Sequence, residues 1–523
     1  MGRKKIGHES DIEVKDKLRM KGSDGRKLIE FMVFAATDCV QDLTSELEKD
    51  FSKNGNSHYP RYFILVIIMY CFYRRLFFYS DIEYALKNDE IIKIYTRGMP
   101  ICKNTIRNFL EDSNNEIIRR IFLYTLVQLN DFKLLSFLHY FIDGTDALVR
   151  ASKTFVIYEN EIKALEQMKK WKLLHKNTKR SCNRTIRALT KKLKEHEDDE
   201  EMVDMIDLIL SRLELYNKKK KKKLDLFKQE IEDTNKNYIS ITFPGARRIL
   251  TKKGKTDMGK NLQIAMNDNN CVIASIFSKN GNDFKTLPEI LPILKENFII
   301  LKELQKEYGE RNNTGEISKM IEKAILCCDA GYWSSENLKY IEENAIKALI
   351  QPKKVATYVK NKFLEILYEK EGKNTKEEVE LNRKQLKRLY NAYQCKYERI
   401  LKLVPKKGQN KKNKDPHKKE TREYKCEDCT GCPYIDDCKF KQITEEITPF
   451  ENEITNKFTN KRYLKIFKER FPKGEGINGF LKGPIGILLL LGASEQAINN
   501  FMHIRNAVYN LTRLNTMVET REL

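Results

Sequence analysis

The sequence lacks an apolar stretch long enough to cross a membrane. Its longest apolar run, YFILVIIMYCFY at 62–73, is followed directly by Arg74 and Arg75, and it falls short of the roughly 20 residues that a spanning helix needs. The first residues, MGRKKIGHESDIEVKDK, contain no apolar core of the kind found in signal peptides. We therefore expect no membrane association and a cytoplasmic location, with the run at 62–73 forming a buried helix.

A disulfide framework of the secreted type is also missing. Of the twelve cysteines, eight are scattered and four are clustered in YKCEDCTGCPYIDDC, which suits a reducing cytosol and one metal site. Four thiolates can fill the tetrahedral shell of one structural zinc ion. Close cysteines also bind iron–sulfur clusters, and a loop of free cysteines remains an alternative. The candidate ligands are Cys426, Cys429, Cys432 and Cys438.

Acidic residues are too few to balance the basic ones. The chain of 523 residues has 97 Lys and Arg against 74 Asp and Glu, a formal net charge of +23. Such an excess favours a polyanionic partner, although solvated helix faces in a lysine-rich chain would produce it too. The length leaves room for about two to four domains.

Strand-like alternation is scarce before residue 136, and apolar residues recur there at helical spacing. We expect 1–135 to form a helical N-terminal domain, either a DNA-binding module of helix-turn-helix type or a plain helical bundle. Strand signals begin at 138–143 and alternate with helical patterns up to residue 352, which predicts a mixed α/β core over 136–352. The later strand signals are NLQIAMND, CVIASIFSK, AILCCD and ALIQP.

Two insertions are expected to interrupt this core. The first, 159–236, is charged and helical, and we interpret it as a helical hairpin. The second, 353–460, begins with a helical pattern, continues in the basic linker PKKGQNKKNKDPHKK and ends in the cysteine cluster. Residues 461–523 return to apolar helices that would complete the core, and Ser494 is expected to cap the last helix.

Two aspartates stand after apolar strands. Asp143 follows Tyr140-Phe141-Ile142 and precedes what we interpret as a glycine turn at Gly144, and Asp329 follows the strand 324–328. A buried carboxylate is costly unless it is paired, hydrogen-bonded or bound to a metal. Each aspartate alone could be a turn or cap residue, but two at strand ends of one sheet could converge on a metal ion.

The motifs around these acids resemble those of a known family. FIDGTDA and CDAGYWSSENL resemble the first and second acidic motifs of DDE transposases of prokaryotic insertion sequences, and EGINGFLKGPIGILLLLG resembles the third. NLQIAMND and GNDFKTL resemble the block between the first two, and residues 58–111 resemble an InsH-like N-terminal domain. The cysteine cluster is similar to one found in some members.

The resemblance implies a ribonuclease-H-like α/β core and a DNA transposase. Such an enzyme cleaves the ends of its element and joins the freed 3′-hydroxyl to target DNA, and a homodimer on DNA in the nucleoid is expected. The implied catalytic acids and ligands of two Mg²⁺ or Mn²⁺ ions are Asp143, Asp329 and Glu475. The implied DNA contacts are Lys482, seven residues after Glu475, together with Arg247, Arg248 and Arg470.

The chemistry supports this ligand set independently. Phosphodiester cleavage needs an activated nucleophile and stabilisation of charge on the phosphate, and two divalent ions can supply both. Mg²⁺ prefers oxygen ligands, so a few carboxylates suffice. Two other functions stay open: a catalytically inactive, transposase-derived DNA-binding protein, and a metal-dependent nuclease without joining activity.

Overall fold

The computed structural model describes residues 10–49, 59–76, 78–149, 156–173, 179–211, 238–240, 243, 245–250, 256–310, 324–352, 392–394, 400–404, 419–426, 431–433, 435, 442–458, 460–482, 488–490 and 494–522.

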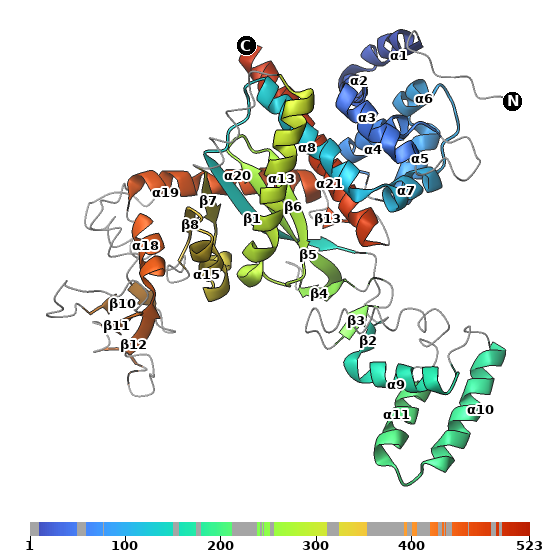
Figure 1. The fold of residues 1–523 in the computed structure, drawn as a ribbon, viewed down its shortest axis with the longest axis vertical. Coiled ribbons are helices and arrows are strands. Elements are labelled where there is room, and N and C mark those ends of the chain that lie inside the picture. The colour runs from blue at the N-terminus through green and yellow to red at the C-terminus, as the bar shows by residue number, and fades with distance from the viewer. Residues whose placement is uncertain are drawn as a thin grey trace.

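The N-terminal part of the chain is helical, as predicted. Helices α1 to α7 form a lobe beside the central sheet, and α8 runs from this lobe along α13 and α21 (Figure 1). Its helices are α1 (Ser10–Arg19), α2 (Gly22–Ala35), α3 (Asp38–Lys49), α4 (Arg61–Tyr73), α5 (Tyr79–Asn88), α6 (Glu90–Thr96), α7 (Lys103–Asp112) and α8 (Asn115–Asp131). The apolar run lies in α4, whose side chains from Phe63 to Phe72 are all buried, so the predicted buried helix is confirmed. In the described parts of the chain, no helix is both long and apolar enough to cross a membrane.

The central sheet contains antiparallel and parallel strands. Its strands are β1 (His139–Leu148), β4 (Arg247–Leu250), β5 (Thr256–Asn267), β6 (Val272–Ser278), β7 (Ile325–Cys328), β8 (Ala348–Ile350) and β13 (Leu488–Leu489). β5 runs antiparallel to β1 and carries β6 and β4 on its other side, while β7 and β8 continue the sheet in parallel beyond β1. This strand order is that of a ribonuclease-H-like core, as predicted.

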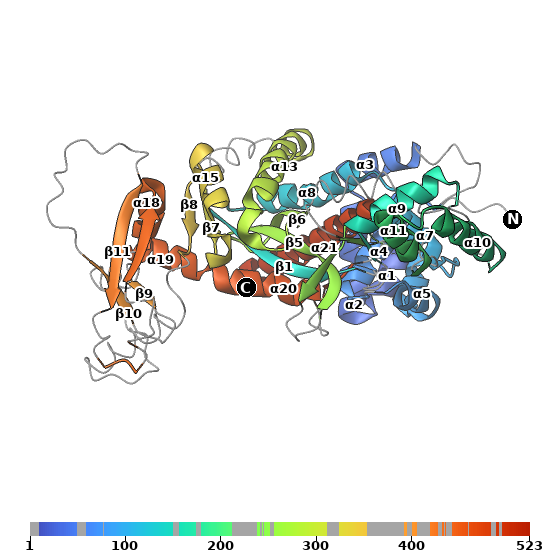
Figure 2. The same cartoon turned by 90° about the horizontal axis from the view of Figure 1, so that it is seen from below.

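Helices cover both faces of this sheet. They are α13 (Leu287–Tyr308), α15 (Ser335–Glu343), α20 (Arg470–Lys482) and α21 (Glu495–Glu522). α13 and α15 lie on one side and α20 on the other (Figure 2). The expected cap of the last helix is confirmed, because the Ser494 hydroxyl accepts from the amide of Ala497 at 3.1 Å. The Ser334 hydroxyl caps α15 in the same way, accepting from the amide of Asn337 at 3.2 Å.

Buried asparagines on α21 connect the N-terminal lobe to the sheet. Asn500 Nδ2 donates to the carbonyl oxygens of Leu110 at 3.0 Å and Ser113 at 2.8 Å. Asn510 bonds both backbone groups of Val272 on β6, accepting from its amide at 2.8 Å and donating to its carbonyl at 3.0 Å. α21 therefore joins the two parts of the molecule through polar contacts that are fully buried.

The first insertion is helical, as expected, but its described part contains three helices where a two-helix hairpin was predicted. They are α9 (Glu159–Lys170), α10 (Lys179–Glu195) and α11 (Glu200–Ser211). They share a small apolar core of their own that includes Ile206 and Ile209. The short strands β2 (Val156–Tyr158) and β3 (Tyr238–Ser240) pair where the insertion leaves and rejoins the core.

The second insertion corrects a prediction in part. Its described residues form a four-stranded antiparallel sheet that was not predicted, and β9 and β10 fall where helix was expected; the strands are β9 (Ala392–Gln394), β10 (Ile400–Leu403), β11 (Glu420–Cys426) and β12 (Gln442–Ile447). Residues 353–391 and the basic linker at 405–418 lie outside the described residues. The strand β11 is hard to recognise in the sequence, because its two buried residues, Arg422 and Tyr424, are polar or amphipathic and give no apolar alternation. Helices α18 (Pro449–Lys457) and α19 (Lys461–Lys468) follow.

Candidate active site

Asp143 lies within a strand and not at the end of one. β1 continues through Asp143 and Gly144 to Leu148 and pairs with β5 over this whole stretch, so the predicted glycine turn is wrong. Gly144 serves a close approach instead, because a Cβ there would collide with the carboxylate of Asp283 and lie 2.7 Å from Gln263 Nε2.

Asp329 follows β7 directly, as predicted. Its Oδ1 accepts from the amide of Gly331 at 2.9 Å and so begins the short 3₁₀ helix η5 (Ala330–Tyr332). β1 and β7 run in parallel with Phe141 opposite Cys327. Two residues further along each strand, Asp143 and Asp329 therefore stand at the same level of the sheet.

The side chain of Asp143 faces α20. Successive strand residues point to opposite faces, and Gly144 faces Gln263 on the α13 side. On the α20 side, Asn478 Nδ2 donates to Asp143 Oδ2 at 3.4 Å. α20 thus brings residues of the third motif to the first acid.

Glu475 is one helical turn before Asn478 on α20. α20 begins at Arg470, so Glu475 is an interior residue of this helix. Pro472 is compatible with this start because the first turn of a helix needs no amide donor from it. The side chains of Glu475 and Arg470 lie outside the described part of the structure.

Asp283 is a third carboxylate near the site that the sequence did not single out. It lies in the 3₁₀ helix η3 (Asp283–Lys285) and its Oδ1 accepts from Gln263 Nε2 at 2.7 Å and Asn261 Nδ2 at 3.3 Å. A Cβ on Gly331 would lie 2.9 Å from Asp329 Oδ1 and 3.3 Å from Asp283 Oδ2, so the two carboxylates flank this glycine. Burial, opposed in part by these two amides, raises the pKa of Asp283, and the charge of Asp329 raises it further.

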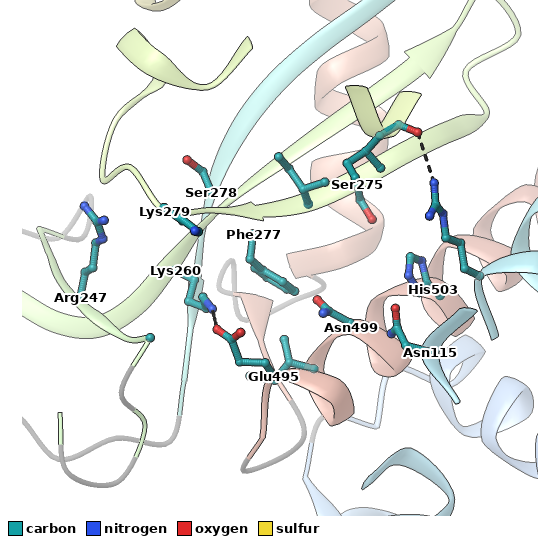
Figure 3. Close-up of a pocket in the computed structure, with 15 residues that line it drawn as sticks. Asn115, Arg247, Lys260, Ser275, Phe277, Ser278, Lys279, Glu495, Asn499 and His503 are labelled. Atoms are coloured by element: carbon teal, nitrogen blue, oxygen red, sulfur yellow. Dashed lines mark hydrogen bonds and ion pairs between the residues drawn. The ribbon is translucent and has the colours of Figure 1, made fainter. Parts of the chain in front are cut away.

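The residues expected to contact DNA differ in their position in the fold and in their contacts. Lys482 ends α20 on the helix face of Glu475 and is half-buried. The guanidinium of Arg248 lies 4.8 Å from the ring centroid of Tyr238, and its Nη2 donates to the Tyr158 hydroxyl at 2.9 Å. Arg247 is half-buried and lines a pocket beside β6 (Figure 3).

The cysteine cluster is only partly described. Cys426 ends β11 as a half-buried thiol and Cys432 is buried, while Cys429 and Cys438 lie outside the described residues. Among the side chains that are described, no three His, Cys, Asp or Glu residues gather as metal ligands. The zinc site therefore stays a prediction, as does the complete set of three acids.

The comparison with protein families gives a match over residues 239–404, to the family described as transposase DDE domain. This range includes Asp283 and Asp329, while Asp143 and Glu475 lie outside it. The comparisons with curated proteins and with solved structures gave no match. The resemblance to DDE transposases is confirmed by this family match, whereas the InsH-like domain and the prokaryotic origin remain predictions.

Proposed function

We propose that this chain, which carries a transposase DDE domain, cleaves DNA at the ends of a mobile element and joins the freed 3′-hydroxyl to target DNA. The observation that supports this most is the register of β1 and β7, which brings Asp143 and Asp329 to one level of the sheet. α20, the helix of Glu475, contacts the first of these acids through Asn478.

Asp143, Asp329 and Glu475 would hold two Mg²⁺ or Mn²⁺ ions in this proposal. The donor set fits, because all three offer carboxylate oxygens, which these ions prefer. Bound ions of this kind activate a nucleophile and stabilise charge on the phosphate. Asn478 would orient the Asp143 carboxylate by donating to Oδ2, and the Gly331 amide would do the same for Asp329 by donating to Oδ1.

Binding to DNA would combine two kinds of contact. The N-terminal helical lobe would recognise the element's ends, and basic side chains of the core, among them Lys482, Arg247 and Arg470, would contact phosphates. The formal net charge of +23 supports a polyanionic partner. A homodimer on DNA and one structural zinc ion at the cysteine cluster complete the proposal.

A strand-transfer assay tests this function. The purified protein is incubated in Mg²⁺ with a duplex that carries an inverted terminal repeat from the DNA flanking its gene, together with a target plasmid. We expect cleavage at the repeat and a covalently joined product, both lost in Asp329→Asn. Cleavage without joining would indicate a nuclease, and binding without cleavage in Mg²⁺ or Mn²⁺ would indicate an inactive DNA-binding protein.

A further inference from the structure

A basic pocket of about 420 Å³ lies beside the outer strand β6, between β4, α8 and the first turns of α21 (Figure 3). Of the side chains that line it, four are cationic and one is acidic, within the part of the chain that is described. These five are Arg119, Arg247, Lys260, Lys279 and Glu495.

Lys260 is a nearly buried cation whose partner is exposed. Its Nζ pairs with Glu495 Oε1 (Figure 3), yet the Lys260 side chain is 9% exposed and the Glu495 side chain is 65% exposed. The ammonium also lies 5.4 Å from the ring centroid of Phe243 and 5.7 Å from that of Phe277. A buried ammonium needs a counter-ion, whereas the exposed carboxylate can return to water at little cost.

The backbone approaches this ion pair closely at Gly245, which has no Cβ. A Cβ on Gly245 would lie 2.7 Å from Glu495 Oε1 and 2.9 Å from Lys260 Nζ, so a larger residue would displace the pair. Arg119, in contrast, is held by its own partners, donating to Asn297 Oδ1 at 2.7 Å and pairing with Glu296 at 3.2 Å. Arg119 therefore adds positive charge, while Lys260 is the cation whose anion can be exchanged.

The pocket shares a face of the sheet with the first acid. Lys260 stands opposite Ala147 and Ile264 stands opposite Asp143. Residues directly opposite in an antiparallel pair, and residues two or four apart on one strand, point to the same face. Lys260 therefore lies on the Asp143 face, four residues along β5, which corresponds to roughly 13 Å.

We propose that this pocket binds a phosphodiester group of DNA through Lys260, and that Glu495 occupies the position of that phosphate in the free protein. The inference rests on the proposed transposase function. DNA that reaches Asp143 along this face would bring a backbone phosphate to Lys260, with exposed Lys279 beside it. Binding there displaces the Glu495 carboxylate, so Glu495 competes with DNA and weakens its binding.

The test measures binding of the full chain to a random-sequence 30-base-pair duplex by fluorescence anisotropy, in EDTA so that no cleavage occurs. Glu495→Gln keeps a hydrogen-bond acceptor for Lys260 but removes the competing charge, and we expect the Kd to fall on the order of three- to tenfold. Lys260→Met keeps the apolar stem, and we expect it to weaken binding and reduce the steepness of the salt dependence by about one unit.

The matched control is Glu336→Gln. Glu336 pairs with Lys285 on the same core, but both side chains are more than half exposed, at 51% and 57%. This variant changes the net charge by the same amount, so it measures the general electrostatic gain alone. The double variant Lys260→Met/Glu495→Gln should lose the additional gain of Glu495→Gln, because the cation that it frees is gone.

The outcomes distinguish failure of the phosphate site from failure of the proposed transposase function. Tighter binding by Glu495→Gln than by Glu336→Gln, lost in the double variant, supports the phosphate site. Equal binding by the two single variants overturns the site and leaves the proposed function standing. If the wild-type protein binds no DNA at low salt, the proposed function fails, and the site fails with it.

Discussion

Asn478 on α20 contacts Asp143, the first of the three candidate acids. Its amide donates to Asp143 Oδ2 at 3.4 Å, and it stands one turn after Glu475 on the same helix. A group that orients a metal-binding carboxylate affects metal affinity more than DNA affinity, because it does not itself contact DNA.

We predict that Asn478→Ala lowers the cleavage rate about tenfold and raises the Mg²⁺ concentration needed for half-maximal rate, with unchanged DNA binding. Single-turnover cleavage across a Mg²⁺ titration measures both quantities. Gly479→Ala, at a neighbouring position with open space around it, is the control. An unchanged Mg²⁺ dependence in Asn478→Ala would show that the amide does not position the acid.

His503 is a half-buried residue whose imidazole stacks on Phe122, with ring centroids 5.9 Å apart. Its Nδ1 is buried and has no hydrogen-bond partner among the described groups. Burial lowers the pKa of His503 to about 3, and the positive charge of Arg119 contributes in the same direction. The folded protein therefore keeps this ring neutral at pH values where the unfolded chain protonates it.

Because the pKa of His503 is lower in the folded than in the unfolded state, acid lowers the stability of the folded protein. Below pH 6.5 the unfolded state binds one more proton than the folded state, so His503 costs about 1.4 kcal/mol of stability for each pH unit down to about pH 3. We predict that the wild type loses about 2 kcal/mol more unfolding free energy than His503→Phe between pH 6.5 and 5. Urea unfolding at the two pH values measures it, and parallel losses in both proteins would refute the shifted pKa.

Among the elements, α21 has a structural role that its apolar stripe alone does not reveal. This stripe packs against the core: Ala497, Phe501, Ile504, Val508 and Leu511 are all buried. The buried asparagines beside it satisfy backbone groups of β6, of the last turn of α7 and of Ser113 after it. A buried amide that loses its partner costs more than the bond itself contributes.

We predict that Asn510→Ala destabilises the protein by about 2–4 kcal/mol, because it leaves both backbone groups of Val272 without their partner. Thr516→Ala, at an exposed position on the same helix, should change stability by less than about 0.5 kcal/mol. Thermal unfolding of the two variants gives the comparison. Similar melting temperatures would mean that α21 is held by its apolar face alone.

How well each element could be predicted depends on where its side chains lie. β1, β5, β6 and β7 are apolar runs buried in the sheet, so their sequence identifies them. β11 and β12 carry alternating charged residues and have little apolar core between them, so the same rules did not predict these strands. The length of β1 past Gly144 could not be predicted, because glycine indicates a turn until the close approach of Asp283 is known.

The residues of the candidate site could also be predicted only in part from the sequence. Asp143 and Asp329 could be found because each follows an apolar strand in a recognisable motif. Asp283 could not, since the groups that make it notable, Asn261 and Gln263, come from β5 and meet it only in the folded chain. The sequence contains one indirect signal of this site: Asn261 and Gln263 alternate within a buried strand, and buried amides need hydrogen-bond partners.

At the scale of the whole molecule, the fold brings together acids that are far apart in the sequence. β1 and β7 place Asp143 and Asp329 side by side, and α20 approaches from the opposite side to α13 (Figure 2). The assignment of Glu475 as the third acid depends on α20 presenting that carboxylate to the same site. Its competitors are Glu469, which stands between α19 and α20, and Glu495, which begins α21.

The most direct measurement is single-turnover cleavage of an end-containing duplex in Mg²⁺ by Glu475→Gln and Glu469→Gln. An amide keeps the size of a carboxylate but lacks the charge that a metal ligand supplies. We predict that Glu475→Gln binds the duplex normally and does not cleave it, while Glu469→Gln cleaves at close to the wild-type rate. Normal cleavage by Glu475→Gln together with loss of cleavage in Glu469→Gln would contradict the assignment of Asp143, Asp329 and Glu475 as one catalytic site.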